Sequence, residues 1–432
     1  MDNFHENIFS TREGELYIEE LKATALAEQF GTPLFVYSET HIRDRFAEIK
    51  EEFLNKHPGS FAAYAGKAFL TPAICRIVDE EGCHLDVVSA GELYTAKRAS
   101  FPPERISYHG NNKTYEEIDG AIGSGVGRII IDGLDELALV EELAKKHEKK
   151  QAVLFRITPE VKAGAHAHIS TGNRDSKFGI PLDEDVLFPL LESAIESPFI
   201  DFRGFHFHIG SQIFDASPYL EAADKALEVI ENVNKRFSYS ISELVIGGGF
   251  GIRYTEAEER KPYSFFMDPV MESIKNFCSG HGLKTPNVGI EPGRSIVGNA
   301  CVTLYKIGTI KKIPGGTHFV SIDGGMSDNI RPALYEAKYE AIVANKAGEN
   351  PSEKVTICGK LCESGDRIIE DIMIAPSERG DILCVFATGA YGYSMASNYN
   401  KIPKPAVLLV KGNKAEIIVR RQSLEEMTAS EF

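Results

Sequence analysis

Over about the first two thirds of the chain, short runs rich in β-branched and aromatic residues alternate with segments whose apolar residues recur at helical spacing. Residues 134–146 and 218–233 are two such helical segments, and charged residues occupy the face opposite the apolar one. Strand–helix alternation favours a parallel sheet covered by helices, and eight repeats close a (β/α)8 barrel. We therefore predict this TIM-type α/β fold, with strands that begin near Phe61, His84, Ile106, Arg128, Ala152, Phe202, Glu243 and Asn287.

After Cys301 the pattern changes to apolar runs separated by turns, with few long helices. Such a pattern is typical of a mainly β domain. A short apolar run at residues 16–19 could pair into the same domain, which would then be discontinuous in sequence. We predict a barrel over residues 31–300 and a β-rich domain over residues 1–30 and 301–432, with strands near 302–306, 318–322, 354–358, 382–386, 406–410 and 415–419.

Charge excludes one class of partner. The chain has 47 Lys and Arg residues against 63 Asp and Glu residues, a formal net charge of −16. A nucleic acid would be repelled by this charge, because its phosphate backbone is also negative. With 432 residues, 43% of them hydrophobic, the chain is long enough for two or three domains with a sizeable core. We expect a small-molecule partner and no nucleic acid.

The first residues have neither a basic flank nor an apolar core of signal-peptide length, and no stretch is apolar enough to span a bilayer. The number of cysteines is odd, and their spacing matches no zinc site. Reduced thiols are therefore favoured over disulfides or a metal. We expect a cytoplasmic protein with no membrane contact, no metal, and cysteines at Cys75, Cys83, Cys278, Cys301, Cys358, Cys362 and Cys384.

Nearly every predicted strand ends on a functional side chain or a glycine turn. Barrel active sites lie at the carboxyl-terminal rim of the strands, so these groups should converge. Strand–helix junctions are generally polar, and any one member has that simpler explanation. The complete ring favours a single site. Its members are Lys67, Asp86 with Ser89, His109, Asp132, Arg156, His206 with His208, the glycine run 247–251, and Glu291 with Arg294.

Lys67 is the one ionisable group in the block YAGKAF, at the end of an apolar run. A lone lysine at a strand end is normally a solvated surface charge. Together with the other rim groups, however, it completes the parts of a pyridoxal phosphate site: an amine for the aldehyde, a flat group for the ring, amides for the phosphate and an anion for the ring nitrogen. We predict pyridoxal 5'-phosphate as the cofactor, linked to Lys67 as an imine.

The remaining roles follow from side-chain chemistry. His208 can stack its imidazole on the cofactor ring, and Glu291 can favour the protonated ring nitrogen. Ser211 and the amides of Gly248 and Gly249 can form a phosphate cradle. Each feature also has a structural alternative: a buried hydrogen-bonded histidine, a salt bridge or an ordinary glycine turn.

Cys362 is the candidate proton donor. When a carboxylate leaves an amino acid, a proton must reach the same carbon, and a thiol can deliver it at neutral pH. The acidic neighbours Glu363 and Asp366 favour this role over that of a cysteine packed in the core.

Taken together, these blocks resemble the diaminopimelate decarboxylase family of fold-type III pyridoxal phosphate enzymes, which is related to alanine racemase and to eukaryotic-type ornithine decarboxylases. The resemblance runs almost end to end, from Phe35 onward. It is specific because many separate blocks occur in one order: YAGKAF, DVVSAGEL, HGNNKT, ISTG with SKFGI, GFHFHIGSQ, GGGFGI, EPGRSIVG, RPALY, CESGD and GAYGYSMASNYN.

The resemblance implies that Lys67 and Cys362 are catalytic, and that Cys362 and Glu363 reach into the barrel of a partner subunit. A homodimer with shared active sites is then the active unit. The implied cofactor-binding residues are Lys67, His208, Ser211, Gly248, Gly249, Glu291, Gly293, Arg294 and Tyr391, and the implied substrate-binding residues are Arg294, Arg331, Tyr335, Glu363 and Tyr391.

Some positions depart from the usual family pattern, and they concern substrate preference rather than reaction type. Phe69 stands where Asn is commonest, Ala90 replaces a frequent Gly, and Thr158 replaces the Asn of an Asn-Pro pair. The run 401–404, Lys-Ile-Pro-Lys, replaces a run that bears arginine. None of these changes removes a predicted catalytic group.

The charged residues favour one substrate. Ornithine and lysine end in a bare ammonium group, whereas diaminopimelate ends in an ammonium and a carboxylate. Arg294 and Arg331 suit that carboxylate, and Glu363 suits the ammonium, although one arginine could instead serve the cofactor phosphate. We predict decarboxylation of meso-2,6-diaminopimelate to L-lysine and carbon dioxide, the last step of lysine biosynthesis. A related ornithine, lysine or polyamine-precursor decarboxylase and a non-catalytic cofactor-binding regulator remain alternatives.

Overall fold

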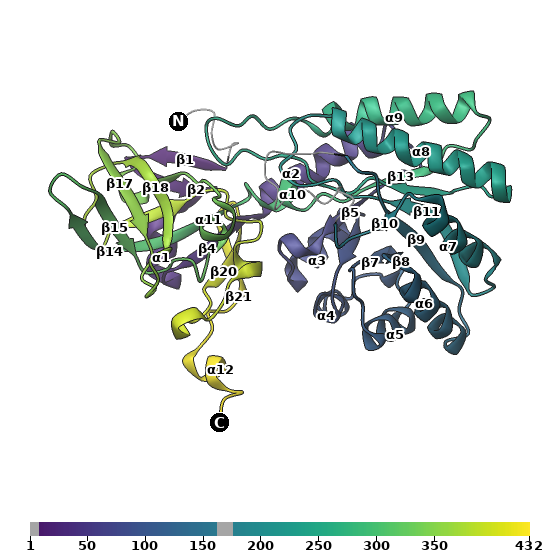
Figure 1. Cartoon of the computed structure of the whole chain (residues 1–432). Coiled ribbons are helices and arrows are strands. Elements are labelled where there is room, and N and C mark those ends of the chain that lie inside the picture. Colours follow the sequence, from purple (N-terminus) through teal and green to yellow (C-terminus); the bar gives the residue numbers. More distant parts are fainter. Residues whose placement is uncertain (1–7, 162–175) are drawn as a thin grey trace. The chain divides into compact units, whose positions relative to one another are not determined.

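A computed structural model describes residues 8–161 and 176–432 (Figure 1). The start of the chain, considered above for a signal peptide, and the block ISTG at 169–172 lie outside the described residues. By the contacts within the chain, the structure divides into two compact units. The barrel unit comprises residues 46–251 and 260–293, and the β unit comprises the residues up to 45 together with 252–259 and 294–432.

In the barrel unit, eight parallel strands of the described residues close on themselves, because the last one pairs with the first. The predicted (β/α)8 barrel is confirmed. β9 and β11 begin slightly before the predicted residues. The strands are β5 (Phe61–Ala65), β6 (His84–Val87), β7 (Ile106–Tyr108), β8 (Arg128–Ile131), β9 (Gln151–Thr158), β11 (Ile200–His206), β12 (Glu243–Val245) and β13 (Asn287–Ile290), and a short β10 (Ile180–Pro181) extends β9.

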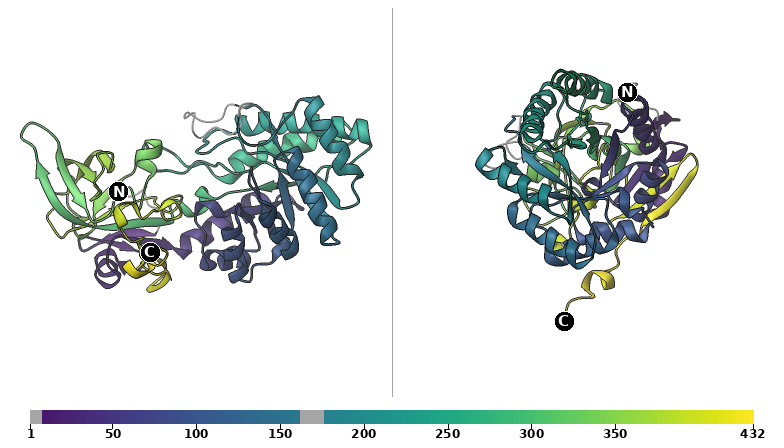
Figure 2. Two further views of the ribbon diagram at one scale, coloured as in Figure 1. Left: turned by 60° about the horizontal axis from the view of Figure 1, so that its bottom comes forward. Right: turned by 90° about the vertical axis from the view of Figure 1, so that its right-hand side faces the viewer.

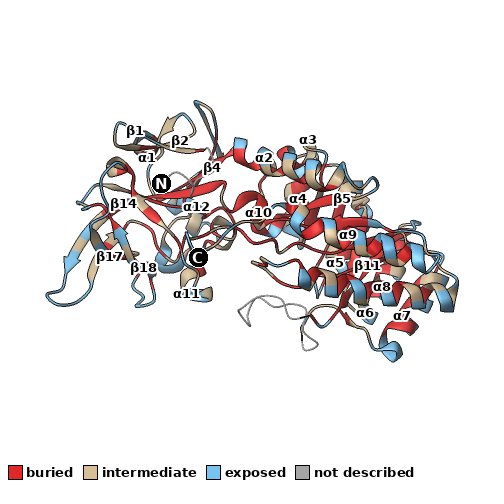
Figure 3. Ribbon diagram, turned by 90° about the horizontal axis from the view of Figure 1, so that it is seen from above, coloured by how far each residue is buried: buried red, intermediate tan, exposed pale blue. Residues whose placement is uncertain are grey.

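Helices form a ring around these strands in the right-hand view of Figure 2, and Figure 3 shows buried and exposed residues side by side on them. Local sequence sets their starts. Thr71, Ser89 and Thr114 each precede a helix and accept a hydrogen bond from a backbone amide of its first turn. The barrel-unit helices are α3 (Pro72–Glu80), α4 (Ala90–Arg98), α5 (Tyr115–Ser124), α6 (Leu134–Lys146), α7 (Glu184–Glu196), α8 (Ser217–Phe237) and α9 (Tyr263–Gly280).

A charged layer fills the amino-terminal end of the barrel. Arg128 Nε lies 2.9 Å from Glu243 Oε2, and Arg203 Nη1 lies 3.2 Å from Glu243 Oε1. His84 Nδ1 is 3.2 Å from Arg128 Nη1, and the Phe61 ring centroid is 4.6 Å from Arg128 Cζ. Because Arg128 begins β8 and Glu243 begins β12, their ion pair connects strands on different sides of the barrel. Such buried charges are tolerated because each has a partner.

The β unit contains a large sheet in which the path β18-β17-β15-β14-β4-β20-β21 is continuous and β19 pairs with β14 and β16. The second, mainly β region is confirmed. The members are β4 (Leu34–Ser38), β14 (Cys301–Lys312), β15 (His318–Ile322), β16 (Ala341–Val343), β17 (Glu353–Cys358), β18 (Arg367–Ile374), β19 (Ile382–Val385), β20 (Ala406–Lys411) and β21 (Lys414–Val419).

The start of the chain forms its own three-stranded sheet of β1 (Phe9–Arg12), β2 (Glu15–Ile18) and β3 (Leu21–Lys22). The strand expected at residues 16–19 is therefore present as β2, but it pairs within this small sheet. Leu16 and Ile18 still pack into the core of the β unit. The helices outside the barrel ring are α1 (Ala23–Phe30), α2 (Glu39–Ile49), α10 (Arg294–Val297), α11 (Arg331–Tyr335) and α12 (Leu424–Thr428).

The contacts place residues 31–45, 252–259 and 294–300 in the β unit, although the sequence assigned them to the barrel. The reason for the first segment is long-range pairing: β4 is antiparallel to β14 and parallel to β20. All five residues of β4 are buried. Among the helices that the structure describes, none is both long and apolar enough to cross a membrane.

The charged layer predicts a pH effect on stability. Burial and the charge of Arg128 lower the pKa of His84 from 6.5 to about 4. The folded protein then binds this proton less readily than the unfolded chain, so the free energy of unfolding should fall between about pH 6.5 and 4, by up to about 3 kcal/mol from this group. His84→Asn keeps an acceptor for Arg128 but does not titrate, and should flatten this decline.

Urea unfolding of both proteins across that pH range measures the difference. The exposed His281, changed to Asn, provides the control and should keep the wild-type pH dependence. An unchanged slope in His84→Asn would contradict the assignment.

Candidate active site

Lys67 lies in a single helical turn directly after β5. The backbone around it is held in place, because Ala65 N donates to Pro292 O at 3.1 Å and Tyr64 Oη donates to Phe69 O at 2.6 Å. Tyr64 and Phe69 are buried, whereas Lys67 is exposed. A fixed turn thus presents a reachable amine at the carboxyl-terminal rim.

Glu291 directly follows β13 and is 8% exposed. Its Oε2 lies 2.9 Å from His206 Nε2, at the end of β11, and its Oε1 lies 3.1 Å from His109 Nε2, just after β7. Burial raises the pKa of Glu291, but the two imidazoles outweigh burial and hold this pKa well below 4.5. Glu291 is therefore an anion at neutral pH.

The two histidines respond differently to this anion. Burial dominates at His206 and lowers its pKa to about 4. Burial also acts on His109, but the carboxylates of Asp86 and Glu291 outweigh it and raise the pKa of His109. The side chains of His109, His206 and Glu291 could together ligate a metal, since their ligand atoms lie within 4.8 Å of one another. Glu291 Oε2 is hydrogen-bonded to His206 Nε2, whereas the contact of Glu291 Oε1 with His109 Nε2 is an ion-pair contact.

His208 follows β11 and accepts a hydrogen bond at Nδ1 from Gly248 N, at 3.3 Å. The proton of the neutral ring is then on Nε2. Burial, and next the positive charge of Lys67, keep the pKa of His208 well below 6.5. A neutral, flat imidazole therefore lies within the electrostatic reach of the Lys67 amine.

The glycine run is required by close backbone approach. A Cβ on Gly248 would overlap the carbonyl oxygen of Glu291, and Gly249 has a φ of 100°, in the region that favours glycine. Ile213 N donates to Gly249 O at 3.0 Å, which holds the loop containing Ser211 against the glycine run. The loop that contains Ser211 and the glycine run therefore lie side by side, as a backbone cradle for an anion requires, and the amide of Gly248 itself donates to His208.

Other members of the predicted ring form ion pairs. Arg156 Nε lies 3.9 Å from Asp132 Oδ1, at the rim between β8 and β9. The structure adds a pair that we did not predict: Lys113 is 7% exposed, donates to Ile130 O at 2.7 Å and binds Glu136. Its only sequence signal was the block HGNNKT. These pairs surround the rim with compensated charge.

In the β unit, the side chains of Arg294 and Arg331 meet at Tyr254. Arg294 Nη1 donates to Tyr254 Oη at 2.5 Å, and Arg331 Nη1 donates to the same oxygen at 2.7 Å. The ring of Tyr391 lies 4.7 Å from Arg294 Cζ. Tyr335 ends α11, the short helix that begins with Arg331, and is partly exposed. Sequence reasoning missed Tyr254, which looks like an ordinary aromatic after the glycine run.

Cys362 and Glu363 are exposed in the β unit. The backbone of Cys362 is anchored, because its amide donates to Asn400 Oδ1 at 2.7 Å. Asp366, which we had grouped with them, is buried and accepts a hydrogen bond from Met326 N at 2.7 Å. Asp366 thus shapes the loop, whereas the thiol and the Glu363 carboxylate are accessible.

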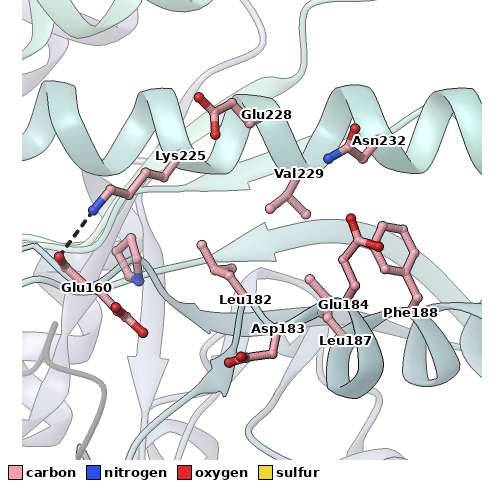
Figure 4. Close-up of a pocket in the computed structure, with 11 residues that line it drawn as sticks. Glu160, Leu182, Asp183, Glu184, Leu187, Phe188, Lys225, Glu228, Val229 and Asn232 are labelled. Atoms are coloured by element: carbon pink, nitrogen blue, oxygen red, sulfur yellow. Dashed lines mark hydrogen bonds between the residues drawn. The ribbon is translucent and has the colours of Figure 1, made fainter.

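A pocket of about 430 Å³ lies on the barrel unit between α7 and α8 (Figure 4). Lys225 Nζ donates to Glu160 O across its edge at 3.2 Å. None of the predicted site residues is among the described residues that line it. The predicted site is therefore separate from this pocket.

Comparison with known proteins identifies the family. The model for "Pyridoxal-dependent decarboxylase, pyridoxal binding domain" matches residues 39–298. The diaminopimelate decarboxylase of Bacillus subtilis is 46% identical over 414 residues, which are 96% of this chain and 94% of that protein. The chain belongs to the diaminopimelate decarboxylase family.

Solved structures agree with this assignment. The diaminopimelate decarboxylase from M. jannaschii in complex with L-lysine has a TM-score of 0.92 and 35% identity, covering 99% of this chain and 98% of that chain. A lysine/ornithine decarboxylase from Vibrio vulnificus, complexed with putrescine, shares the fold at a TM-score of 0.77 and 24% identity, covering 90% and 97%. The resemblance of the sequence to the diaminopimelate decarboxylase family is confirmed, and pyridoxal phosphate is the cofactor.

The close approach at Gly248 predicts a large effect of one methyl group. Gly248→Ala should displace Glu291 and the amides of the glycine run, and so weaken pyridoxal phosphate binding to the apoenzyme at least about tenfold. Fluorescence titration with the cofactor measures the affinity. In Gly120→Ala, where the added methyl meets open space, the affinity should stay at the wild-type value. Equal affinities for the two variants would contradict the prediction.

Proposed function

We propose that the carboxyl-terminal rim of the barrel unit binds pyridoxal phosphate, with Lys67 as its covalent anchor. The reaction is decarboxylation of meso-2,6-diaminopimelate to L-lysine and carbon dioxide, and the observation that carries it is 46% identity to a diaminopimelate decarboxylase over nearly the whole chain. When bound, the cofactor supplies an electron sink for the pair left on Cα as carbon dioxide departs. Residues of this chain bind the substrate, orient it and deliver the proton.

Glu291 has the property that the electron sink requires. An anion beside the ring nitrogen favours the protonated ring, and this carboxylate is kept ionised by His206 and His109. We assign His208 to the face of the ring, because it is neutral and hydrogen-bonded in a fixed orientation. We assign the phosphate to the adjoining loops that carry Ser211 and the glycine run, where Gly248 and Gly249, with Gly293 beside the anchor strand, let the backbone approach closely.

Cys362 is assigned as the proton donor to Cα after carbon dioxide leaves. Its exposure and the anchored backbone support this role, because a donor must reach the substrate from a defined position. The neighbouring Glu363 carboxylate suits the distal ammonium group.

Arg294 and Arg331, with Tyr335 and Tyr391, are assigned to the distal carboxylate of the substrate. Two guanidinium groups that meet at one oxygen atom form a strongly positive site, which suits a carboxylate and disfavours a bare ammonium. This argument separates diaminopimelate from ornithine and lysine. It also makes a regulator without turnover less favourable, because such a protein has no use for a substrate-specific cation pair.

We further infer a cytoplasmic homodimer in which Cys362 and Glu363 complete the site of the partner subunit. Both residues are exposed in the β unit, as such a role requires. The seven cysteines are free thiols, in keeping with a reducing compartment.

Substrate choice is directly testable. Purified holoenzyme should release carbon dioxide from meso-2,6-diaminopimelate with a kcat/KM at least about a hundredfold above that for L-ornithine or L-lysine, because both lack the distal carboxylate. Comparable turnover of L-ornithine would make the chain a polyamine-precursor decarboxylase. Cofactor binding without carbon dioxide from any of the three would favour the regulator.

Mixed dimers test the shared site. Lys67→Ala and Cys362→Ala should each lose at least about a hundredfold in activity. In an equimolar random mixture, half of the dimers contain one site with both groups intact, so activity should return to about one quarter of the wild type.

The control replaces Cys362→Ala with Cys358→Ala, which removes a thiol that we assign no role, and mixing it with Lys67→Ala should give about one half. If the Lys67→Ala and Cys362→Ala mixture stays as inactive as its parents, each site lies within one subunit.

A further inference from the structure

Tyr254 is a buried residue to which neither the family motifs nor the proposed reaction gives a role. It is 6% exposed and lies in the segment 252–259 of the β unit. Its hydroxyl oxygen accepts two hydrogen bonds from two different cations, Arg294 at 2.5 Å and Arg331 at 2.7 Å. A phenol oxygen has two acceptor positions, so both are occupied by guanidinium groups.

Aromatic rings hold the same two cations from their faces. Arg331 Cζ lies 5.0 Å and Arg294 Cζ lies 5.7 Å from the centroid of the Tyr254 ring. Tyr339 packs edge-on against Tyr254, with the ring centroids 5.4 Å apart, and its Oη accepts from Arg331 Nη1 at 2.9 Å. Asn329 Oδ1 accepts from Arg331 N at 3.3 Å. The two guanidinium groups are therefore fixed before any ligand arrives.

Two like charges this close repel each other, and the shared hydroxyl offsets the repulsion only in part because it is neutral. A carboxylate brings a negative charge that offsets this repulsion, and its two oxygens match the fork geometry of a guanidinium group. The geometry thus favours a ligand with a carboxylate and disfavours one with only an ammonium.

We propose that Tyr254 is a positioning residue that sets the spacing of Arg294 and Arg331, so that the two arginines together select substrates with a distal carboxylate. This inference rests on the proposed substrate-binding role of the two arginines and deepens it. Tyr254 itself need not touch the substrate.

The charge state of Tyr254 adds a pH dependence. Burial raises its pKa, but Arg294 and Arg331 outweigh burial and lower it, whereas burial keeps the pKa of the neighbouring Tyr339 raised. Tyr391 also faces Arg294, and the Glu258 carboxylate accepts a hydrogen bond from the backbone amide of Tyr254 at 2.7 Å. Loss of the Tyr254 proton would reduce the charge of the cluster from about +2 to about +1. The KM for diaminopimelate should then rise at alkaline pH.

The test is binding of L-lysine and cadaverine to the holoenzyme by calorimetry. Decarboxylation at one centre of diaminopimelate leaves the distal carboxylate as the carboxylate of L-lysine, and cadaverine lacks it. In Tyr254→Phe, the dissociation constant for L-lysine should rise about tenfold, the loss expected for hydrogen bonds to charged groups, with cadaverine binding unchanged. Tyr339→Phe, which leaves the bridge between the arginines intact, should have a smaller effect on L-lysine.

Two further readouts separate positioning from general damage. Tyr254→Phe should raise the KM for diaminopimelate about tenfold with kcat within about threefold, and should lose the alkaline rise in KM. In a pH titration followed by absorbance near 295 nm, Tyr254→Phe should form about one tyrosinate fewer than the wild type at the lower-pH end of the tyrosine transition.

Wild-type affinity of Tyr254→Phe for L-lysine would overturn the proposal, and so would an equal loss of L-lysine and cadaverine binding. A different result would contradict the proposed substrate-binding role of the arginines instead. In that case the wild-type enzyme would bind cadaverine as tightly as L-lysine, and Arg331→Lys would change neither affinity.

Discussion

The buried carboxylate of Glu291 connects three strands of the barrel, because His109 follows β7, His206 ends β11 and Glu291 itself follows β13. Burying an anion is costly unless it is paired, and here both carboxylate oxygens face an imidazole. The same strand closes the barrel by pairing with β5, which leads to Lys67. The pairing that closes the barrel therefore also brings the strands that lead to Glu291 and Lys67 next to each other.

The two ends of the barrel use charge for different purposes. At the amino-terminal end, Arg128 and Glu243 satisfy each other across the interior and leave little for a ligand. At the carboxyl-terminal end, Glu291 is ionised and Lys67 is exposed, so an anion and an accessible amine, both of which we assign to the cofactor, occur at the same rim. At the carboxyl-terminal end the backbone approaches closely where glycine is present, as at Gly248.

Much of this could be predicted from sequence because strand starts and rim residues are local features. Most barrel strands begin at the residues that alternation indicated, and Glu291 and His206 lie together as the ring of strand ends required. β4 could not be assigned in this way, because its partners β14 and β20 lie far along the chain and its apolar run fits either unit. Tyr254 could not be predicted for a related reason, because its hydrogen bonds are with two arginines that are distant in sequence.

Shared fold does not decide substrate in this group, since the lysine/ornithine decarboxylase of Vibrio vulnificus has the same architecture at 24% identity. The difference between a bare ammonium and an ammonium with a carboxylate is one negative charge at the distal end. A site distinguishes the two most strongly when its own cations are left uncompensated by the wrong ligand. In the described β unit, Arg294 and Arg331 both donate to the Tyr254 hydroxyl, a bridge without full negative charge, which suits the selection that we propose for the two arginines. A carboxylate in place of Tyr254 would hold the arginines equally well but would cancel the attraction on which selection depends.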